Sequence, residues 1–270
     1  MKEKKLIILV LVILIVAGII VAFNLKQTKE NSLEKILEKG NLILGLDDSF
    51  PPMGFRNEDN EIVGFDIDVA KEVCKRLNIE LKIQPISWDA KEQELNSYNI
   101  DCIWNGMSIT EEREKIMSLS NAYLKNNMSF VVKNGSNILS LKDLEGKKVG
   151  VQAGSSAEEL LESSEINNKL KEVVTYNENL TAFMDLEINQ IDAVFLDDIV
   201  ANYYMATNNK NYKVLEEGLE AEEYAIGFRK EDTELRDKVN SILSEMKKDG
   251  ILGQISTKWF GKDITIIEEK

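Results

Sequence analysis

The stretch "DCIWNGMSITEEREK", Asp101 to Lys115, joins a predicted strand to a predicted helix. Its short apolar run is typical of a strand inside a sheet. Thr110 is a good helix N-cap, and the two glutamates that follow suit the positive end of the helix dipole. The third helical position carries Arg113, where a capping box would have Glu or Gln. A cation gains nothing from the dipole there, so Arg113 needs another explanation.

The same strand-to-helix order recurs along most of the chain. We predict strands at "LILGL", "IELKIQPI", "DCIWN", "KKVGVQ", "LKEVVTY", "IDAVFLD" and "EEYAIGFRK", with amphipathic helices between most of them. This βαβ order implies mostly parallel sheets flanked by helices. Because the pattern restarts after "SFVVKNGSNI", we predict an α/β protein with two lobes, joined by extended segments near 129–133 and 222–229.

The first 32 residues are set apart from these lobes. Leu6 to Phe23 is an uncharged run of 18 residues, preceded by three lysines that favour a cytoplasmic start. We favour an uncleaved membrane anchor over a cleaved signal because "IVAF" is a weak cleavage site. No cysteine adjoins the run, which argues against a lipid-modified N-terminus. The body is then expected outside the cytoplasm, anchored to the membrane, or secreted or periplasmic if the segment is cleaved.

The lobe boundaries follow from the restart of the pattern. We predict a polar tether ending at residue 32, lobe 1 from 33–131 and 222–265, lobe 2 from 132–221, and a tail at 266–270. Each lobe has enough residues for its own core.

Composition excludes several classes of function. The formal net charge of −14 argues against nucleic acid and against broad adhesion to anionic lipid. The chain has no histidine, which removes Ser-His-Asp catalysis and the common zinc sites, so we predict no metal and no cofactor. Cys74 and Cys102 could form a disulfide outside the cytoplasm or stay free as small apolar residues. The sequence leaves both states open.

Candidate binding residues gather where strands end, which is where open α/β sheets bind ligands. The ends of four strands are followed by Asp47, Asp48, Ser49 and Phe50; by Asn105, Gly106, Met107 and Ser108; by Gln152, Gly154, Ser155 and Ser156; and by Asp197 and Asp198. The Arg113 guanidinium suits a carboxylate, and the Asp197 carboxylate suits an ammonium group. A small zwitterion held between two lobes would use both, with Phe50 and Trp88 as walls.

Each of these residues also has an ordinary structural explanation. Arg113 could pair with the neighbouring glutamates on a solvated face, and Asp197 could cap the helix that follows it. Phe50 and Trp88 could belong to the core. The segments "KEQEL" and "LEEGLEAEE" are most simply solvated charge. "VQAGSS" lacks the lysine of a P-loop, so nucleotide binding is not expected.

Six segments, taken in order, resemble a known family. They are "LGLDDSFPPMGFRNEDNEIVGFDIDVAKEVCKRL", "GMSITEER", "VGVQAGSSAE", "IDAVFLDD", "EEYAIGFRK" and "ISTKWFG". Together they are similar to the polar amino-acid-binding proteins of ABC importers, the family 3 extracellular solute-binding proteins. The similarity extends over about 33–261. It implies the two-lobed periplasmic-binding-protein-like fold with two hinge strands, which closes on a free amino acid and docks on a membrane permease.

The resemblance also implies a role for each candidate residue. The ligand carboxylate is expected at Arg113, Ser108, Ser155 and Ser156. The ligand amino group is expected at Asp197, Gly106 and Asn105, and the ligand side chain at Asp47, Phe50 and Trp88. Asn105 stands where the family often has Ser or Ala, so the identity of the ligand is left open at "polar amino acid".

Three functions are weighed on this basis. The favoured one is an extracellular amino-acid receptor for an ABC importer, a monomer without catalytic activity. The second is an enzyme of the same fold, such as a cyclohexadienyl dehydratase, with Asp47, Asp48 or Glu94 as general acid. The third is a ligand-sensing domain that acts on a separate signalling chain.

Overall fold

The computed structural model describes residues 31–208, 212–219 and 221–268. The predicted membrane segment at 6–23 lies outside these residues. Among the helices that are described, none has the length and apolar run needed to cross a bilayer.

The described chain alternates strands and helices. The strands are β1 (Asn41–Leu46), β2 (Ser49–Phe50), β3 (Gly54–Arg56), β4 (Ile62–Val63), β5 (Glu80–Pro85), β6 (Cys102–Ser108), β7 (Met117–Leu119), β8 (Leu124–Lys133), β9 (Lys148–Gln152), β10 (Glu172–Tyr176), β11 (Ala193–Asp197), β12 (Tyr212–Val214) and β13 (Ala221–Arg229). The helices are α2 (Ser32–Lys39), α3 (Phe65–Leu77), α4 (Lys91–Asn96), α5 (Glu111–Ile116), α6 (Ser156–Ser163), α7 (Asn179–Glu187), α8 (Asp198–Asn208), α9 (Thr233–Lys248) and α10 (Ile251–Phe260).

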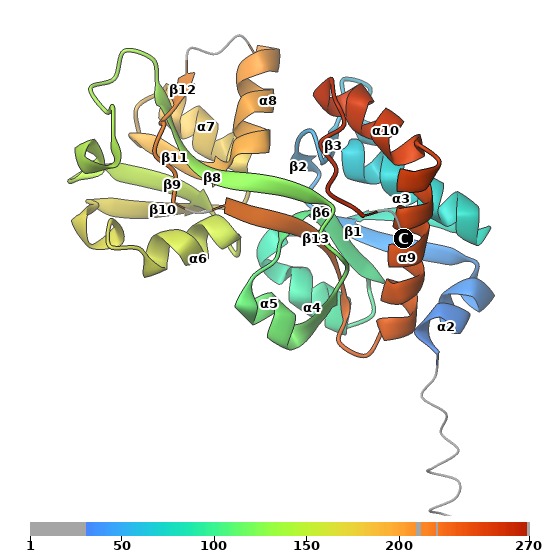
Figure 1. Cartoon of the computed structure of the whole chain (residues 1–270). Coiled ribbons are helices and arrows are strands. Elements are labelled where there is room, and N and C mark those ends of the chain that lie inside the picture. The colour runs from blue at the N-terminus through green and yellow to red at the C-terminus, as the bar shows by residue number, and fades with distance from the viewer. Residues whose placement is uncertain (1–30, 209–211, 220, 269–270) are drawn as a thin grey trace, which may run out of the picture.

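One long sheet runs through both lobes in the strand order β10-β9-β11-β8-β13-β6-β1-β5. Strand β1 is parallel to β5 and β6 in one lobe, and β9 is parallel to β10 and β11 in the other. The two long strands β8 and β13 are antiparallel to each other and lie side by side between the lobes (Figure 1). The predicted two-lobed α/β fold with mostly parallel sheets is confirmed. The residue boundaries of the lobes stay a prediction.

Strands β8 and β13 divide their pairing between the lobes. Residues 124–127 of β8 pair with 221–224 of β13, and residues 128–132 of β8 pair with β11. Residues 224–227 of β13 pair with β6. The backbone therefore crosses from one lobe to the other within continuous strands.

Serine and threonine side chains cap two helices near the strand termini, and the Thr110 cap was predicted from the sequence. The Thr110 Oγ1 atom accepts a hydrogen bond from the Arg113 N–H at 3.3 Å, and α5 begins at the next residue. The Ser155 Oγ atom caps α6 by accepting from the Glu158 N–H at 3.2 Å. These caps satisfy N–H groups that a helix leaves unpaired in its first turn. They also fix the start of the two helices that carry Arg113 and Ser156.

Both cysteines are buried free thiols, so the disulfide that the sequence left open is not formed in this structure. Cys74 lies in α3 and Cys102 in β6. Burial raises the pKa of Cys74 to about 12 and raises that of Cys102 well above its usual value. Both side chains therefore act as small apolar groups of the core.

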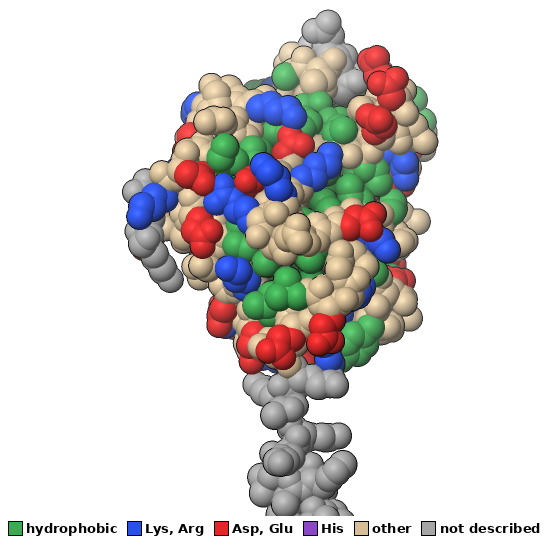
Figure 2. Space-filling view, turned by 90° about the vertical axis from the view of Figure 1, so that its right-hand side faces the viewer, with side chains coloured by type: hydrophobic (Ala, Val, Ile, Leu, Met, Phe, Trp, Pro, Cys, Tyr) green, Lys and Arg blue, Asp and Glu red, His purple; other side chains and the backbone are tan. Residues whose placement is uncertain are grey.

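The surface mixes charges of both signs in spite of the net negative charge. Figure 2 shows Lys and Arg side chains interspersed with Asp and Glu and with apolar groups on the face that carries α9 and α10. A uniform acidic field is absent from this face.

The core of the first lobe provides a stability test. Leu44 is fully buried in the middle of β1, and Leu37 is 43% exposed on α2. We expect Leu44→Ala to lower the free energy of unfolding by about 2–5 kcal/mol through lost burial and a residual cavity. The control Leu37→Ala removes the same atoms and should change it by less than about 0.5 kcal/mol. Urea unfolding of the two variants measures the difference, and equal losses would contradict the placement of β1 in the core.

Candidate functional site

A small cavity lies between the lobes where the strand ends meet. Its volume is about 20 Å³, and it is lined by Phe50, Trp88, Asn105, Gly106, Ser108, Arg113, Gln152, Ser155, Ser156 and Asp197. Nine of the ten predicted site residues are in this lining. The tenth, Asp47, is in contact with it because the Gln152 Nε2 atom donates to the Asp47 Oδ2 atom at 2.6 Å. Residues far apart in the sequence therefore converge on one enclosed space.

Arg113 is buried beside this cavity, with 2% of its surface exposed. Its Nη1 atom donates to the Ser108 carbonyl at 2.9 Å, so the side chain turns back over the loop that precedes its helix. The ion pair that Arg113 makes is with Glu159 of α6 at 3.8 Å, across the lobes. The surface pairing with glutamates of its own helix is therefore not what the structure has. Among the described residues, the buried Nε atom of Arg113 has no hydrogen-bond partner.

Asp197 approaches the cavity from the end of β11. Its Oδ1 atom accepts hydrogen bonds from Tyr224 Oη at 2.5 Å and from Asn126 Nδ2 at 2.8 Å. The pKa of Asp197 is raised to about 7, mainly by burial and also by the nearby charge of Glu222, while the Tyr224 hydrogen bond and the Arg113 charge oppose the rise. An ammonium group placed beside Asp197 would restore the ionised form.

Asn105 has its amide orientation set by a neighbour. The Asn105 Oδ1 atom accepts from the Asp47 N–H at 3.0 Å, which leaves the Nδ2 group as the free end of the side chain. That buried donor has no partner among the described residues. The free donor suits an oxygen of a ligand, whereas the predicted contact with a ligand amino group would need the second lone pair of Oδ1. An unpaired buried donor costs about 1–3 kcal/mol, which a ligand oxygen could offset.

Two serines at the start of α6 differ in what they can offer. The Ser155 hydroxyl donates to the Gln152 carbonyl at 2.7 Å and caps the helix, so its hydrogen-bonding capacity is used within the fold. The Ser156 hydroxyl lies 3.0 Å from the Ser108 hydroxyl of the other lobe. A helix N-terminus such as that of α6 also favours nearby negative charge.

Glycine is required at one position in the cavity lining and at one position beside it. Gly106 has φ +56°, its N–H donates to the buried Asp66 carboxylate at 2.7 Å, and a Cβ there would lie 2.9 Å from the Phe50 ring. Gly154 has φ +67°, and a Cβ there would lie 2.8 Å from the Asp89 Cα atom. Gly154 thus lets the backbones of the two lobes approach closely.

Several residues at this interface were missed or misassigned at the level of sequence. Lys91 is 3% exposed and donates to the Gly154 carbonyl at 2.8 Å, and Glu222 is 9% exposed and contacts the two cavity serines. The expectation of solvated charge was therefore wrong for these members of "KEQEL" and "LEEGLEAEE". Burial, followed by the charge of Arg113, lowers the pKa of Lys91. Gln152, the last residue of β9, was named among the strand-end candidates, but no ligand contact was predicted for it.

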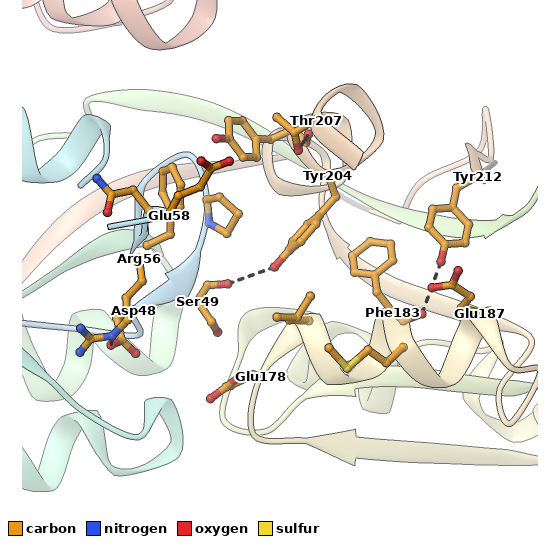
Figure 3. A pocket seen from close by; sticks show the side chains of 16 residues that line it. Asp48, Ser49, Arg56, Glu58, Glu178, Phe183, Glu187, Tyr204, Thr207 and Tyr212 are labelled. Carbon is orange, nitrogen blue, oxygen red and sulfur yellow. Dashed lines mark hydrogen bonds and ion pairs between the residues drawn. The ribbon is translucent and has the colours of Figure 1, made fainter. Parts of the chain in front are cut away.

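A second, larger cavity of about 790 Å³ opens at another edge of the interface. Figure 3 shows Asp48, Ser49, Arg56 and Glu58 of one lobe facing Glu178, Phe183, Glu187, Tyr204, Thr207 and Tyr212 of the other. Tyr204 Oη donates to the Ser49 carbonyl at 3.4 Å across this space. The lining lacks the buried, unpaired donors of the small cavity. The small cavity is therefore the better candidate for specific recognition.

Residues 42–262 match the family model described as bacterial extracellular solute-binding proteins, family 3. The chain belongs to this family. It is 34% identical over 238 residues to the L-cystine-binding protein TcyJ of Escherichia coli K12, which covers 87% of this chain and 88% of the relative. These findings identify a solute-binding protein of the class that serves ABC uptake systems.

Solved structures agree with this assignment. A substrate-binding protein of an ABC uptake transporter from Streptococcus pneumoniae, with bound histidine, superimposes with a TM-score of 0.86 at 40% identity, covering 88% of this chain and 99% of the other. The ancestral amino-acid-binding protein AncCDT-1, described as a precursor of cyclohexadienyl dehydratase, gives a TM-score of 0.79 at 32% identity, covering 85% of this chain and all (100%) of the other.

Asp197 provides a pH test. Because its pKa rises from 3.8 to about 7 on folding, the protonated form is favoured in the folded state. The stability that this group contributes is fully present below pH 3.8 and is lost as the pH rises through about 7. Asp197→Asn keeps the group neutral at every pH. The free energy of unfolding of the variant, relative to that of wild type, should therefore rise by about 2–4 kcal/mol from pH 4.5 to pH 8.

Urea unfolding of the full-length protein at the two pH values measures this gain. A difference between Asp197→Asn and wild type that is the same at both pH values would mean that Asp197 is ionised in the folded protein at both.

Proposed function

We propose that the protein is an extracellular receptor that binds a polar amino acid in the small cavity and delivers it to an ABC importer permease. The observation that carries this proposal is the opposition of a buried guanidinium, Arg113, and a buried carboxylate, Asp197, across one enclosed space. The two groups match the two charges that every free amino acid carries. We infer that Arg113 binds the α-carboxylate and Asp197 binds the α-ammonium group.

Desolvation supports these two assignments. The buried Nε of Arg113 and Nδ2 of Asn105 are donors without partners among the described residues, and both can bond to ligand oxygens. The raised pKa of Asp197 indicates a carboxylate that is poorly solvated as an anion. A zwitterion would supply acceptors for the two donors and a cation for the carboxylate. Binding would therefore satisfy three groups that the fold leaves incomplete.

Ligand entry needs the lobes to move apart. The cavity of about 20 Å³ has room for about one water molecule and not for an amino acid. Contacts that join the lobes directly include Lys91 to Gly154, Ser108 to Ser156, and Asp47 to Gln152. We infer that β8 and β13 act as the hinge of an opening motion, and that the ligand stabilises closure by adding contacts to both lobes.

Asp47, Phe50 and Trp88 are proposed to surround the ligand side chain. Phe50 and Trp88 form apolar walls of the cavity, and Asp47 is buried behind Gln152. Burial raises the pKa of Asp47, although the hydrogen bonds from Ser49 and Gln152 favour its ionised form. We therefore propose that the ligand is an amino acid with a polar or cationic side chain, which would lie near Asp47.

The enzyme alternative rests on one specific observation. A buried carboxyl with a raised pKa is what a dehydratase needs as general acid, and Asp47 has that property. By contrast, Asp48 pairs with Arg56 at 2.5 Å, and Glu94 accepts a hydrogen bond from Asn99 at 2.8 Å. Incubating the protein with prephenate and arogenate distinguishes the two functions, because turnover of either would replace the receptor proposal. The ligand-sensing alternative would use the same cavity without a permease.

A thermal-shift panel tests the function directly. The full-length protein is heated with each of the twenty L-amino acids and with L-cystine. A true ligand at about 100 times its dissociation constant adds about 2.7 kcal/mol to the free energy of unfolding and raises the melting temperature accordingly. We expect a response from a small group of polar amino acids. A flat response across the panel would contradict the proposal.

Two arginine variants decide which cavity is the binding site. Arg113→Ala should weaken binding of the responding amino acid by about 2–5 kcal/mol, because a buried carboxylate loses its charge-assisted bonds. Arg56→Ala removes the same side chain from the larger cavity and should leave the affinity unchanged. Isothermal titration measures both. The reverse pattern would move the site to the larger cavity.

A further inference from the structure

The carboxylate of Glu222 lies among residues predicted to bind the carboxylate of a ligand. Glu222 is on β13, one of the two strands that cross between the lobes. Its Oε2 atom accepts hydrogen bonds from the Ser108 hydroxyl of β6 and, at 3.2 Å, from the Ser156 hydroxyl of α6. The residue is 9% exposed. One buried anion thus contacts a side chain from each lobe.

The two serines of this cluster have few hydroxyl protons with which to bind a ligand. A serine hydroxyl has one proton to donate and two lone pairs that can accept. Ser108 donates its proton to Glu222. Ser156 donates its proton either to Glu222 or to Ser108 Oγ, at 3.0 Å. In both arrangements no hydroxyl proton remains for the cavity, while lone pairs of both oxygens do.

This count alters the roles that the sequence predicts for the two serines. Their side chains cannot donate to a ligand carboxylate while Glu222 accepts from them. They can accept from an ammonium group, which has three protons and no acceptor. Asp197 lines the same cavity, and the charge of Glu222 acts on it. The cavity therefore has a side where only acceptors face the ligand.

We propose that Glu222 is a positioning residue that turns the Ser108 and Ser156 hydroxyls into acceptors, so that the receptor selects ligands with an α-ammonium group. The proposal rests on the proposed function, since it refines which ligand group each side chain meets. Arg113, Asn105 Nδ2 and the N–H groups of α6 are left to bind the ligand carboxylate. Glu222 acts through the serines and does not need to touch the ligand.

The test compares amino acids with analogues in which every α-amino group, two in the case of cystine, is replaced by hydrogen. The pairs are L-cystine with 3,3′-dithiodipropanoate, L-histidine with imidazole-4-propanoate, L-arginine with 5-guanidinopentanoate, and L-glutamine with 4-carbamoylbutanoate. Binding of each pair to the full-length protein is measured by isothermal titration. The readout is the ratio of the two dissociation constants within a pair.

Glu222→Leu removes the acceptor and frees both hydroxyl protons to donate into the cavity. For each pair that wild type binds, the preference for the amino acid should fall by about tenfold or more, with weaker amino-acid binding and stronger analogue binding. Glu222→Gln should largely restore the preference because an amide oxygen can accept the same two protons. Glu223→Leu is the matched control, an exposed glutamate next along β13, and should keep the wild-type preference.

Ser156→Ala gives an independent measurement if Glu222→Leu does not fold. It should weaken the amino acid by about fivefold or more and leave the analogue unchanged, because an acceptor for the ammonium group is lost. If either variant weakens the binding of the amino acid and of its analogue equally, the role proposed for Glu222 is overturned while the proposed receptor function stands. If wild type responds instead to another amino acid of the thermal-shift panel, the same ratio is measured with that amino acid and its analogue without the α-amino group. If the whole panel is flat, the proposed function itself fails.

Discussion

The pairing of β8 with β13 is the constraint on which the rest of the structure depends. Each strand pairs with its neighbour over four residues and then continues into a different lobe, β8 beside β11 and β13 beside β6. Sliding one lobe past the other along the strands would break the β8–β13 hydrogen bonds, whereas a hinge motion that bends the two strands would keep them. The carboxyl ends of β6 and β11 therefore face each other. Arg113 lies just after β6 and Asp197 ends β11, so both side chains reach the cavity between the lobes.

Much of this arrangement could be predicted from the sequence because the relevant signals are local and periodic. The apolar runs mark strands, and the polar residues directly after them mark the edge where ligands bind. Arg113 was recognisable as anomalous because a cation at the start of a helix serves neither the cap nor the dipole. Asp197 was recognisable because it ends a continuous apolar strand. The topology then brings these positions together without further information.

Lys91 and Glu222 could not be found in this way. Both lie in segments rich in charge, where a single buried residue leaves no trace in composition or period. Their burial results from contacts made over long sequence separations, Lys91 with the Gly154 carbonyl and Glu222 with Ser108 and Ser156. The orientation of the Asn105 amide is of the same kind, since it follows from the single N–H of Asp47 that faces it. Which end of an amide side chain is left unbonded depends on tertiary contacts. The sequence therefore indicates Asn105 as a site residue but not that its Nδ2 group is the end without a partner.

The direct hydrogen bonds between the lobes have a kinetic consequence. Lys91 and Arg113 both reach the Gly154 carbonyl, at 2.8 and 3.4 Å, without any ligand atom between them. Such contacts stabilise a shut molecule, and a shut molecule cannot admit a solute. The association rate is then the intrinsic rate multiplied by the fraction of time spent open, and the apparent dissociation constant is raised in the same proportion. One backbone carbonyl thus helps to set how quickly the receptor samples its surroundings as well as how tightly it holds what it catches.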